Sequence, residues 1–187
     1  MNIDQEKEKL RKAMRAEIAA LTEKERLNKS AIVAAKLRKI SSFEQAKTIL
    51  FYYAIDKEVA TQELILEAIQ KNKKVALPYM NKNSSMIHAA LITNIESDLV
   101  RGDYGIMEPK LEIRTEVAVS GIDLVVVPGL AFDQAKYRLG RGKGFYDRFL
   151  AKLPRRTVTI GLAFDFQVVE SLPVTELDIP VSRVVYN

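Results

Sequence analysis

The chain has 187 residues, no cysteine, one histidine and a formal net charge of +5. This length suits one domain, residues 1–187, whose core needs no covalent cross-link. Without cysteine the chain cannot form disulfides, thiolate zinc sites or a cysteine nucleophile. Its N-terminus is too charged for a signal peptide, and no apolar run is long enough to span a membrane. We therefore expect a cytoplasmic monomer with no membrane partner.

The first forty residues predict two helices. Apolar residues from Ile3 to Leu21 recur on one stripe, which predicts an amphipathic helix over residues 3–20. Thr22 and Glu25 form a capping-box pattern, which predicts a second helix that continues to about residue 40. We expect both helices, residues 3–40, to pack on an α/β core formed by the rest of the domain.

Continuous apolar segments then alternate with helical patterns. We expect strands at residues 48–53, 74–79, 86–92, 123–129, 157–164 and 184–186, helices from Thr61 and near 144–152, and loops over 93–120. This alternation is typical of a three-layer α/β domain, with a mostly parallel central sheet covered by helices on both faces. Ligands bind such sheets beyond the carboxyl ends of the strands. The site is therefore expected after Tyr53, Tyr79 and Val127.

Basic residues concentrate in two segments. Residues 1–40 hold 11 Lys and Arg against 6 Asp and Glu, and residues 136–156 hold 8 against Asp147 alone. Two such clusters indicate either a polyanion bound between them or a general attraction to nucleic acid. For the first cluster, a solvated basic helix is an equally good interpretation.

The second cluster contains a glycine-rich segment, RLGRGKGFY, at residues 138–146. Alternating glycines let the backbone adopt positive φ and approach an anion closely, and the helix that follows adds its positive end. The segment is not a Walker A loop, because no Ser or Thr follows the Gly-Lys pair, and it is not a dinucleotide fingerprint. It indicates a phosphate-binding loop. The alternatives are a flexible basic turn, or an RNA-binding patch that stacks bases on Phe145 and Tyr146.

This segment is part of a longer resemblance. DLVVVPGLAFD (123–133), followed by RLGRGKGFYDRFL (138–150), resembles the signature of the 5-formyltetrahydrofolate cyclo-ligase family. Four further segments match that family in the same order along the chain: KEKLR at 7–11, FYYAIDKEVAT at 51–61, VALPYM at 75–80 and residues 160–185. The resemblance therefore covers most of the chain.

The resemblance implies an ATP-dependent reaction that requires Mg²⁺. Its substrate would be 5-formyltetrahydrofolate, with or without a polyglutamate tail, and its products 5,10-methenyltetrahydrofolate, ADP and phosphate. The formyl oxygen would be phosphorylated, and N10 would then attack the formyl carbon and release phosphate. This chemistry needs positioning and charge stabilisation rather than a protein nucleophile, which suits a chain without cysteine. His88, in an expected strand, is interpreted as structural.

The resemblance also implies which residues form the site. ATP would be bound by Lys7, Lys9, Arg11, Arg138, Leu139, Gly140, Arg141, Gly142, Lys143, Gly144, Phe145 and Tyr146. Arg141 and Lys143 would lie nearest the transferred group and have the catalytic roles. Tyr53 and Glu58 would line the folate pocket. The Mg²⁺ ion would be held by Asp147 and Asp178.

Each of these assignments has a plainer alternative. The three basic residues of the first helix could form a solvated face, and Tyr53 could belong to the core. Asp147 could simply favour the positive end of a helix, and Asp178 could pair with Arg183. The chain also departs from the family pattern at Lys136, Leu177 and Ser182, where glycine, histidine and an acidic residue are common.

Two other functions compete with this one. The basic clusters could belong to a nucleic-acid-binding module, although the chain has no RNA-recognition, KH or helix-turn-helix signature. The phosphate loop could also serve another small-molecule ligase or kinase that uses ATP. We expect ATP and a reduced folate as ligands, and no nucleic acid.

Overall fold

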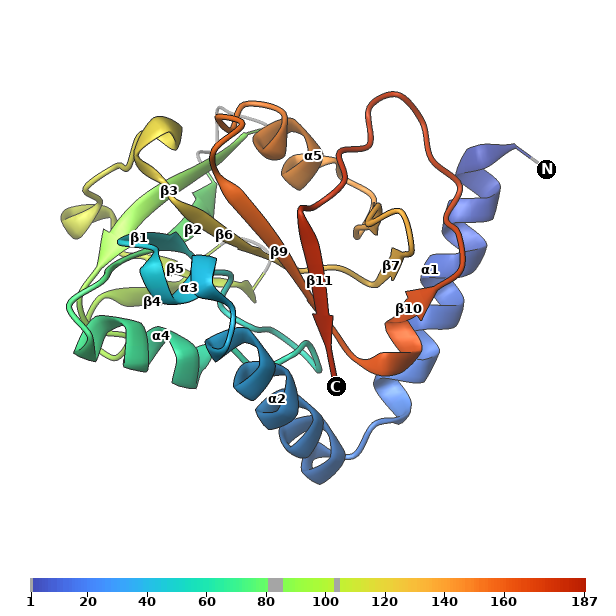
Figure 1. The fold of residues 1–187 in the computed structure, drawn as a ribbon, viewed down its shortest axis with the longest axis horizontal. Helices are drawn as coiled ribbons and strands as arrows, with labels where there is room; N and C mark the ends of the chain where they lie inside the picture. The colour runs from blue at the N-terminus through green and yellow to red at the C-terminus, as the bar shows by residue number, and fades with distance from the viewer. Residues whose placement is uncertain (1, 81–85, 103–104) are drawn as a thin grey trace.

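A computed structural model describes residues 2–80, 86–102 and 105–187, and within them a six-stranded sheet forms the centre (Figure 1). The strand order is β11-β9-β6-β1-β2-β3. The bounds are Thr48–Leu50 for β1, Lys74–Met80 for β2, Ile87–Ile92 for β3, Leu124–Val127 for β6, Val158–Ala163 for β9 and Arg183–Tyr186 for β11. Neighbouring strands run parallel, except that the edge strand β3 is antiparallel to β2. The predicted mostly parallel sheet is confirmed.

Helices cover both faces of this sheet. On one face lie α2 (Glu23–Arg38), α3 (Ser41–Gln45) and α4 (Gln62–Gln70), and on the other lies α5 (Phe145–Leu150), as Figure 1 shows. The surroundings of β6 explain why its sequence is a continuous apolar run. Its residue Val126 packs in the first core cluster, whereas Val125 and Val127 pack in the second, so both faces of the strand are buried.

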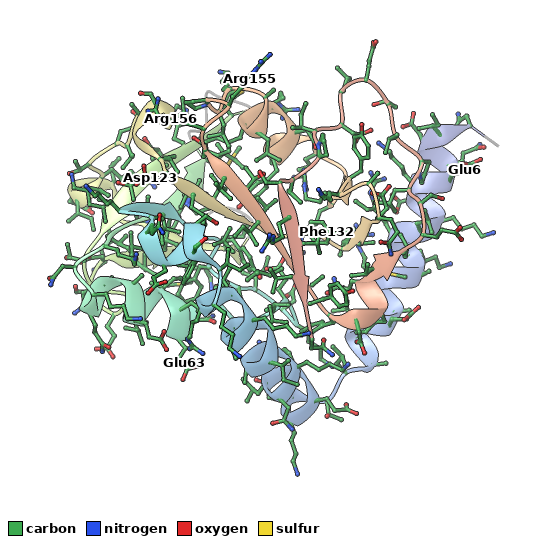
Figure 2. The ribbon with its side chains drawn as sticks, viewed as in Figure 1. Glu6, Glu63, Asp123, Phe132, Arg155 and Arg156 are labelled. Atoms are coloured by element: carbon green, nitrogen blue, oxygen red, sulfur yellow. The ribbon has the colours of Figure 1, made fainter. Side chains whose placement is uncertain are left out.

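Helix α1 (Ile3–Ala20) stands beside a second, smaller sheet (Figure 1). This sheet has the order β10-β7-β8, with bounds Val168–Val169, Ala131–Asp133 and Arg138–Leu139. Met14 of α1 is buried against this sheet. Phe132 of β7 is fully buried (Figure 2), and a Cβ at Gly161 of β9 would lie 2.4 Å from its ring. The missing side chain at position 161 therefore lets the smaller sheet pack closely on the large one.

The predicted boundaries hold at the N-terminus and differ elsewhere. Helix α1 has the predicted bounds, and Thr22 and Glu25 make both hydrogen bonds of the predicted capping box. The strand expected over 48–53 ends at Leu50. There Thr61, expected to cap α4, instead donates from Oγ1 to the Tyr52 carbonyl at 2.7 Å and accepts from the Ala54 amide. Its hydroxyl thus satisfies backbone groups where the strand ladder stops.

The loops expected over residues 93–120 contain regular structure. A hairpin joins β4 (Leu99–Arg101) and β5 (Met107–Pro109), and single 3₁₀ turns form at Leu111–Ile113 and Val119–Gly121. Residues 103–104 of this stretch lie outside the described chain. A further 3₁₀ turn, Asp165–Gln167, precedes β10. None of the described helices is both long and apolar enough to cross a lipid bilayer.

Candidate functional site

Four segments that are far apart in the sequence meet beside the carboxyl end of β1. They are the N-terminal half of α1, the turn at residues 54–58, the glycine-rich loop at 140–144 and the segment 174–178. Hydrogen bonds join the loop to α1 and to the turn, and α1 to the last segment. Most of the predicted site residues belong to these segments or lie directly beside them.

The glycine-rich loop has the backbone that the sequence predicts at two of its three glycines. Gly142 has φ 103° and Gly144 has φ 63°, in the region that side chains disfavour. Gly144 is the residue immediately before α5. At Gly140 a Cβ would lie 2.5 Å from Nη1 of Arg138, so a side chain there would have to displace the end of that guanidinium. Backbone amides can therefore approach an anion closely here.

Helix α1 directs two of its three predicted residues toward this loop. Lys7 and Arg11 are four residues apart and share one helix face, whereas Lys9 lies on the opposite face and is exposed. Nε of Arg11 donates to the Gly140 carbonyl at 3.0 Å, and its side chain is largely buried. The interpretation as a solvated face is wrong for Lys7 and Arg11. It fits Lys9, whose predicted ATP contact is not supported by this position.

Asp178 is paired with Lys7. Nζ of Lys7 lies 2.8 and 2.6 Å from the two carboxylate oxygens, and the amide and hydroxyl of Thr175 donate to Oδ2 as well. Burial alone would raise the pKa of Asp178, but the hydrogen bonds from Lys7 and Thr175 outweigh burial and lower it. The pairing with Arg183 considered from the sequence is wrong. Asp178 could bind a metal ion directly only by releasing Lys7.

Asp147 lies at the start of α5 in a different environment. Its Oδ1 atom is 3.0 Å from Nη2 of the buried Arg138, yet the two are not aligned for a hydrogen bond. Among the described residues, Oδ1 of Asp147 and Nε of Arg138 are buried polar atoms without a hydrogen-bond partner. The Asp147 carboxylate therefore has acceptor capacity left for a hard cation such as Mg²⁺, beside the charge of Arg138.

The described residues contain no group of three or more acidic or histidine side chains that could hold a metal. Mg²⁺ usually keeps several water ligands and binds one or two carboxylates together with substrate phosphates. The site therefore fits an ion that Asp147 holds and that a phosphate ligand and water complete.

On the folate side, Glu58 contacts the glycine-rich loop directly. Nη2 of Arg141 lies 3.0 Å from Oε1 of Glu58 and 3.2 Å from Oδ2 of Asp56. The Glu58 side chain is only 16% exposed, and burial raises its pKa while the charge of Arg141 opposes that rise. The expected folate pocket and the expected phosphate loop therefore share a boundary. Asp56, the second carboxylate that binds Arg141, was not predicted. Its position two residues before Glu58 was the feature of the sequence that could have indicated it.

Two tyrosine side chains, Tyr52 and Tyr146, are influenced by the charge of Glu58. Burial, together with the charge of Glu58, raises the pKa of both Tyr52 and Tyr146, so both phenols stay protonated. The Tyr52 hydroxyl donates to the Val59 carbonyl at 2.8 Å, and the Arg138 guanidinium lies over the Tyr146 ring at 5.4 Å. Tyr53 is partly buried and packs against the core, in line with its structural alternative.

Three residues of the predicted ATP-binding segment, Leu139, Lys143 and Phe145, make contacts other than those with Glu58 and α1 described above. Leu139 is buried in a cluster with Met14 of α1, and this cluster anchors the chain directly before the glycine-rich loop. Lys143 is exposed, with Nζ 5.9 Å from the centre of the Phe145 ring, and Phe145 itself packs partly in the core. Lys143 thus lies on the exposed side of the loop.

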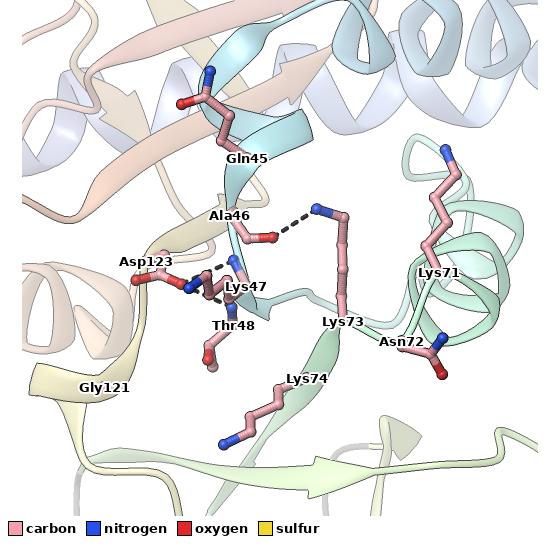
Figure 3. Close-up of a pocket in the computed structure, with 10 residues that line it drawn as sticks. All are labelled: Gln45, Ala46, Lys47, Thr48, Lys71, Asn72, Lys73, Lys74, Gly121 and Asp123. Atoms are coloured by element: carbon pink, nitrogen blue, oxygen red, sulfur yellow. Dashed lines mark hydrogen bonds between the residues drawn. The ribbon is translucent and has the colours of Figure 1, made fainter.

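A depression of about 560 Å³ lies elsewhere, at the amino ends of β1 and β2 (Figure 3). Its wall includes Asp123, whose Oδ2 accepts from the amides of Lys47 and Thr48 at 2.9 Å each. The side chains of Lys71 and Lys74 point apart in Figure 3 and do not converge on one ligand position. None of the predicted site residues lines this depression, so it is separate from the candidate site.

Comparisons with known proteins agree with the resemblance. The model of the 5-formyltetrahydrofolate cyclo-ligase family matches residues 3–187. The chain is 35% identical to the 5-formyltetrahydrofolate cyclo-ligase of Escherichia coli K12 over 89% of this chain and 92% of that protein. It is 29% identical to the mouse 5-formyltetrahydrofolate cyclo-ligase, over 100% of this chain and 96% of that protein.

Solved structures give the same result. The 5,10-methenyltetrahydrofolate synthetase of Aquifex aeolicus superimposes with a TM-score of 0.83 at 35% identity, covering 96% of this chain and 88% of that chain. The Mycoplasma pneumoniae 5,10-methenyltetrahydrofolate synthetase superimposes with a TM-score of 0.77 at 22% identity, covering 96% and 98%. The second likeness concerns the fold alone.

Proposed function

The chain belongs to the 5-formyltetrahydrofolate cyclo-ligase family, and on this basis we propose that it uses ATP to convert 5-formyltetrahydrofolate to 5,10-methenyltetrahydrofolate. The names of its relatives support the folate conversion. The use of ATP is supported by one observation above all, the contact of Arg141 with Glu58. Through it the expected phosphate loop adjoins the expected folate pocket, so a phosphoryl group and a formyl oxygen would meet there.

The reaction must first make the formyl carbon reactive, because an N-formyl group is a poor electrophile. The formyl oxygen attacks the γ-phosphorus of ATP, the bond from that phosphorus to the bridging oxygen breaks, and ADP leaves. N10 then attacks the formyl carbon and loses its proton, and the C–O bond breaks to release inorganic phosphate. Both steps need alignment and stabilisation of negative charge, and neither needs a covalent bond to the protein.

The residues of the site suit these requirements. Arg141 and Lys143 would stabilise charge on the transferred group, and the backbone of the loop at Gly142 and Gly144 would approach the phosphates. Asp147 would hold Mg²⁺, which when bound neutralises charge on the phosphates. Arg11 fixes the start of the loop through the Gly140 carbonyl.

The nucleic-acid alternative fits the structure less well. Lys7, Arg11 and Arg138 make up part of the two basic clusters, but their side chains are mostly buried in contacts with the protein itself. A surface that binds nucleic acid would present such cations to solvent. These three cations are therefore used in the packing of the protein itself, although most other cations of the two clusters are exposed.

The test is to mix the purified protein with Mg-ATP and 5-formyltetrahydrofolate and to follow the near-ultraviolet absorption of the methenyl product. Product should form in proportion to ADP, and omission of ATP should abolish it. Product without ADP would disprove the ATP mechanism. Absence of product, while the E. coli relative is active in the same assay, would disprove the proposed function.

A further inference from the structure

We propose that Arg141 couples the binding of nucleotide to the binding of folate. Its guanidinium binds Glu58 when no nucleotide is present and binds the nucleotide phosphates when nucleotide is present. Nucleotide phosphates would draw the guanidinium away from Glu58, and hydrogen-bond donors of the folate ring would replace it there. This inference rests on the proposed function and adds a thermodynamic link between its two ligands.

Arg141 is already bound by two carboxylates. Nη1 and Nη2 each lie 3.2 Å from Oδ2 of Asp56, and Nη2 also donates to Glu58 at 3.0 Å. These acceptors occupy the same guanidinium edge that would bind a phosphate in a bidentate manner. A phosphate on Arg141 must therefore compete with Glu58 and Asp56.

The turn that carries these two carboxylates is held in place by hydrogen bonds to its neighbours. The Ile55 amide donates to Oε2 of Glu58 at 3.1 Å, and Arg26 of α2 donates to the Glu58 carbonyl at 3.2 Å. Lys57 donates to the carbonyls of Ala19, at 2.6 Å, and Leu21. The turn is thus tied to the C-terminal end of α1 and to α2.

Arg141 is less constrained than the turn. Its side chain is 47% exposed, and it lies between Gly140 and Gly142. A long side chain on a glycine-rich loop can reorient at lower cost than a turn anchored to two helices. When a phosphate binds, we therefore expect the guanidinium to move and Glu58 to stay.

Departure of Arg141 leaves a negative charge on Glu58 without its cation. Glu58 is mostly buried, so losing Arg141 leaves a poorly solvated carboxylate with the Ile55 amide as its remaining donor among the described residues. Such a carboxylate is unfavourable until another donor reaches it. A reduced pterin ring carries N–H donors that can satisfy it. Each ligand therefore favours the other, and by linkage the effect is equal in both directions.

Isothermal titration calorimetry can measure this coupling with the β,γ-imido analogue of ATP, which binds without transfer, in the presence of Mg²⁺. In the wild type, saturating 5-formyltetrahydrofolate should tighten analogue binding by about fivefold or more, and the analogue should tighten folate binding by the same factor. Equal analogue affinity with and without folate overturns the inference. No analogue binding at all overturns the proposed function as well.

Variants separate this exchange from a general effect of charge. Without folate, Glu58→Gln and Asp56→Asn should each tighten analogue binding, because Arg141 is released, and Glu58→Gln should abolish the coupling. Glu67→Gln is the matched control, since it removes the same charge from an ion pair with Arg38 between α4 and α2. Equal effects of Glu58→Gln and Glu67→Gln would mean that net charge alone matters, which overturns the inference.

A double-mutant cycle identifies Arg141 as the link. In an Arg141→Ala background, Glu58→Gln should no longer tighten analogue binding, because the released guanidinium is absent. A gain that persists in this background overturns the role of Arg141. Asp56→Asn repeats the cycle at a side chain that is 72% exposed, where no packing is lost, so the result does not depend on one variant.

Discussion

Lys7 and Asp178, 171 positions apart, form an ion pair in which Nζ lies 2.8 and 2.6 Å from the two carboxylate oxygens. Their side chains are only 13% and 14% exposed, so water competes little with the pair. The contact ties α1 to the segment that precedes β11. It also brings together a residue expected to touch ATP and a residue expected to touch Mg²⁺.

The first prediction follows from this pair. Asp178→Asn should lower the free energy of unfolding at pH 7 by about 1–2 kcal/mol, because a mostly buried ammonium loses its charged acceptor. Lys7 and Thr175 lower the pKa of Asp178 in the folded state below its usual 3.8 despite the opposing effect of burial. The stabilisation is therefore present above the unfolded-state pKa and is lost as pH falls through the folded-state value.

Urea unfolding of the wild type and of Asp178→Asn between pH 7 and pH 3 would measure this, and the difference should shrink at the acid end. Arg183→Ala is the control, with an expected effect within about 0.5 kcal/mol. An equally large loss in Arg183→Ala would contradict the pairing with Lys7.

The second prediction concerns the metal. Asp147→Asn should raise the Mg²⁺ concentration needed for half-maximal activity, and excess Mg²⁺ should partly restore the rate. Asparagine keeps the shape but removes the charge that a hard cation prefers. Asp178→Asn should shift this concentration much less, because Lys7 and Thr175 already occupy its oxygens. If Asp147→Asn leaves the metal titration unchanged, ATP and water hold Mg²⁺ without it.

The third prediction concerns charge during transfer. Lys143→Ala should lower kcat on the order of a hundredfold while changing folate affinity little, because its ammonium is needed as negative charge develops on the phosphoryl group. Steady-state kinetics and folate titration measure the two effects separately. Lys152→Ala removes an exposed lysine just beyond α5 and should leave kcat unchanged. An unchanged kcat in Lys143→Ala would remove this residue from the mechanism.

The fourth prediction concerns Lys136, in the turn between β7 and β8. Its φ of 70° lies in the left-handed region, where glycine carries no steric penalty. Lys136→Gly should therefore raise the free energy of unfolding by about 0.5–1 kcal/mol, after the greater freedom of glycine in the unfolded chain is deducted. Lys136→Ala keeps the penalty and should not stabilise. Urea unfolding of both variants would show whether backbone strain or the side chain matters.

The sequence was most informative where a repeating pattern extended over many residues. Eighteen residues with one apolar stripe predicted α1 with its observed bounds, and the apolar run of β6 predicted a central strand. The small sheet was missed because β8 and β10 contain two residues each, too few to show a period. Thr61 is the N-cap residue of α4, as predicted, but its hydroxyl binds the Tyr52 carbonyl, because the strand ladder stops there and a local pattern cannot show this.

The sequence indicated which residues of the site matter better than it indicated which residues contact each other. The glycine-rich loop could be identified from its composition, since positive φ at Gly142 and Gly144 depends on those residues themselves. The choice of Lys7 over Arg183 as the partner of Asp178 depends on tertiary packing, which no local pattern encodes. The position of Lys9 could have been predicted, because two residues after Lys7 is the far side of a helix.

The contact between α1 and residue 178 has a consequence for biosynthesis. At about 5–20 residues per second, a ribosome needs about 9–34 s to extend the chain from Lys7 to Asp178. During that interval α1 lacks Asp178, and for most of it α1 also lacks the glycine-rich loop at residues 140–144. Strand β11, which closes one edge of the large sheet, emerges later still. The nascent chain therefore leaves the outer edge of β9 unpaired until β11 has been made, and a chaperone would be of most use at this stage.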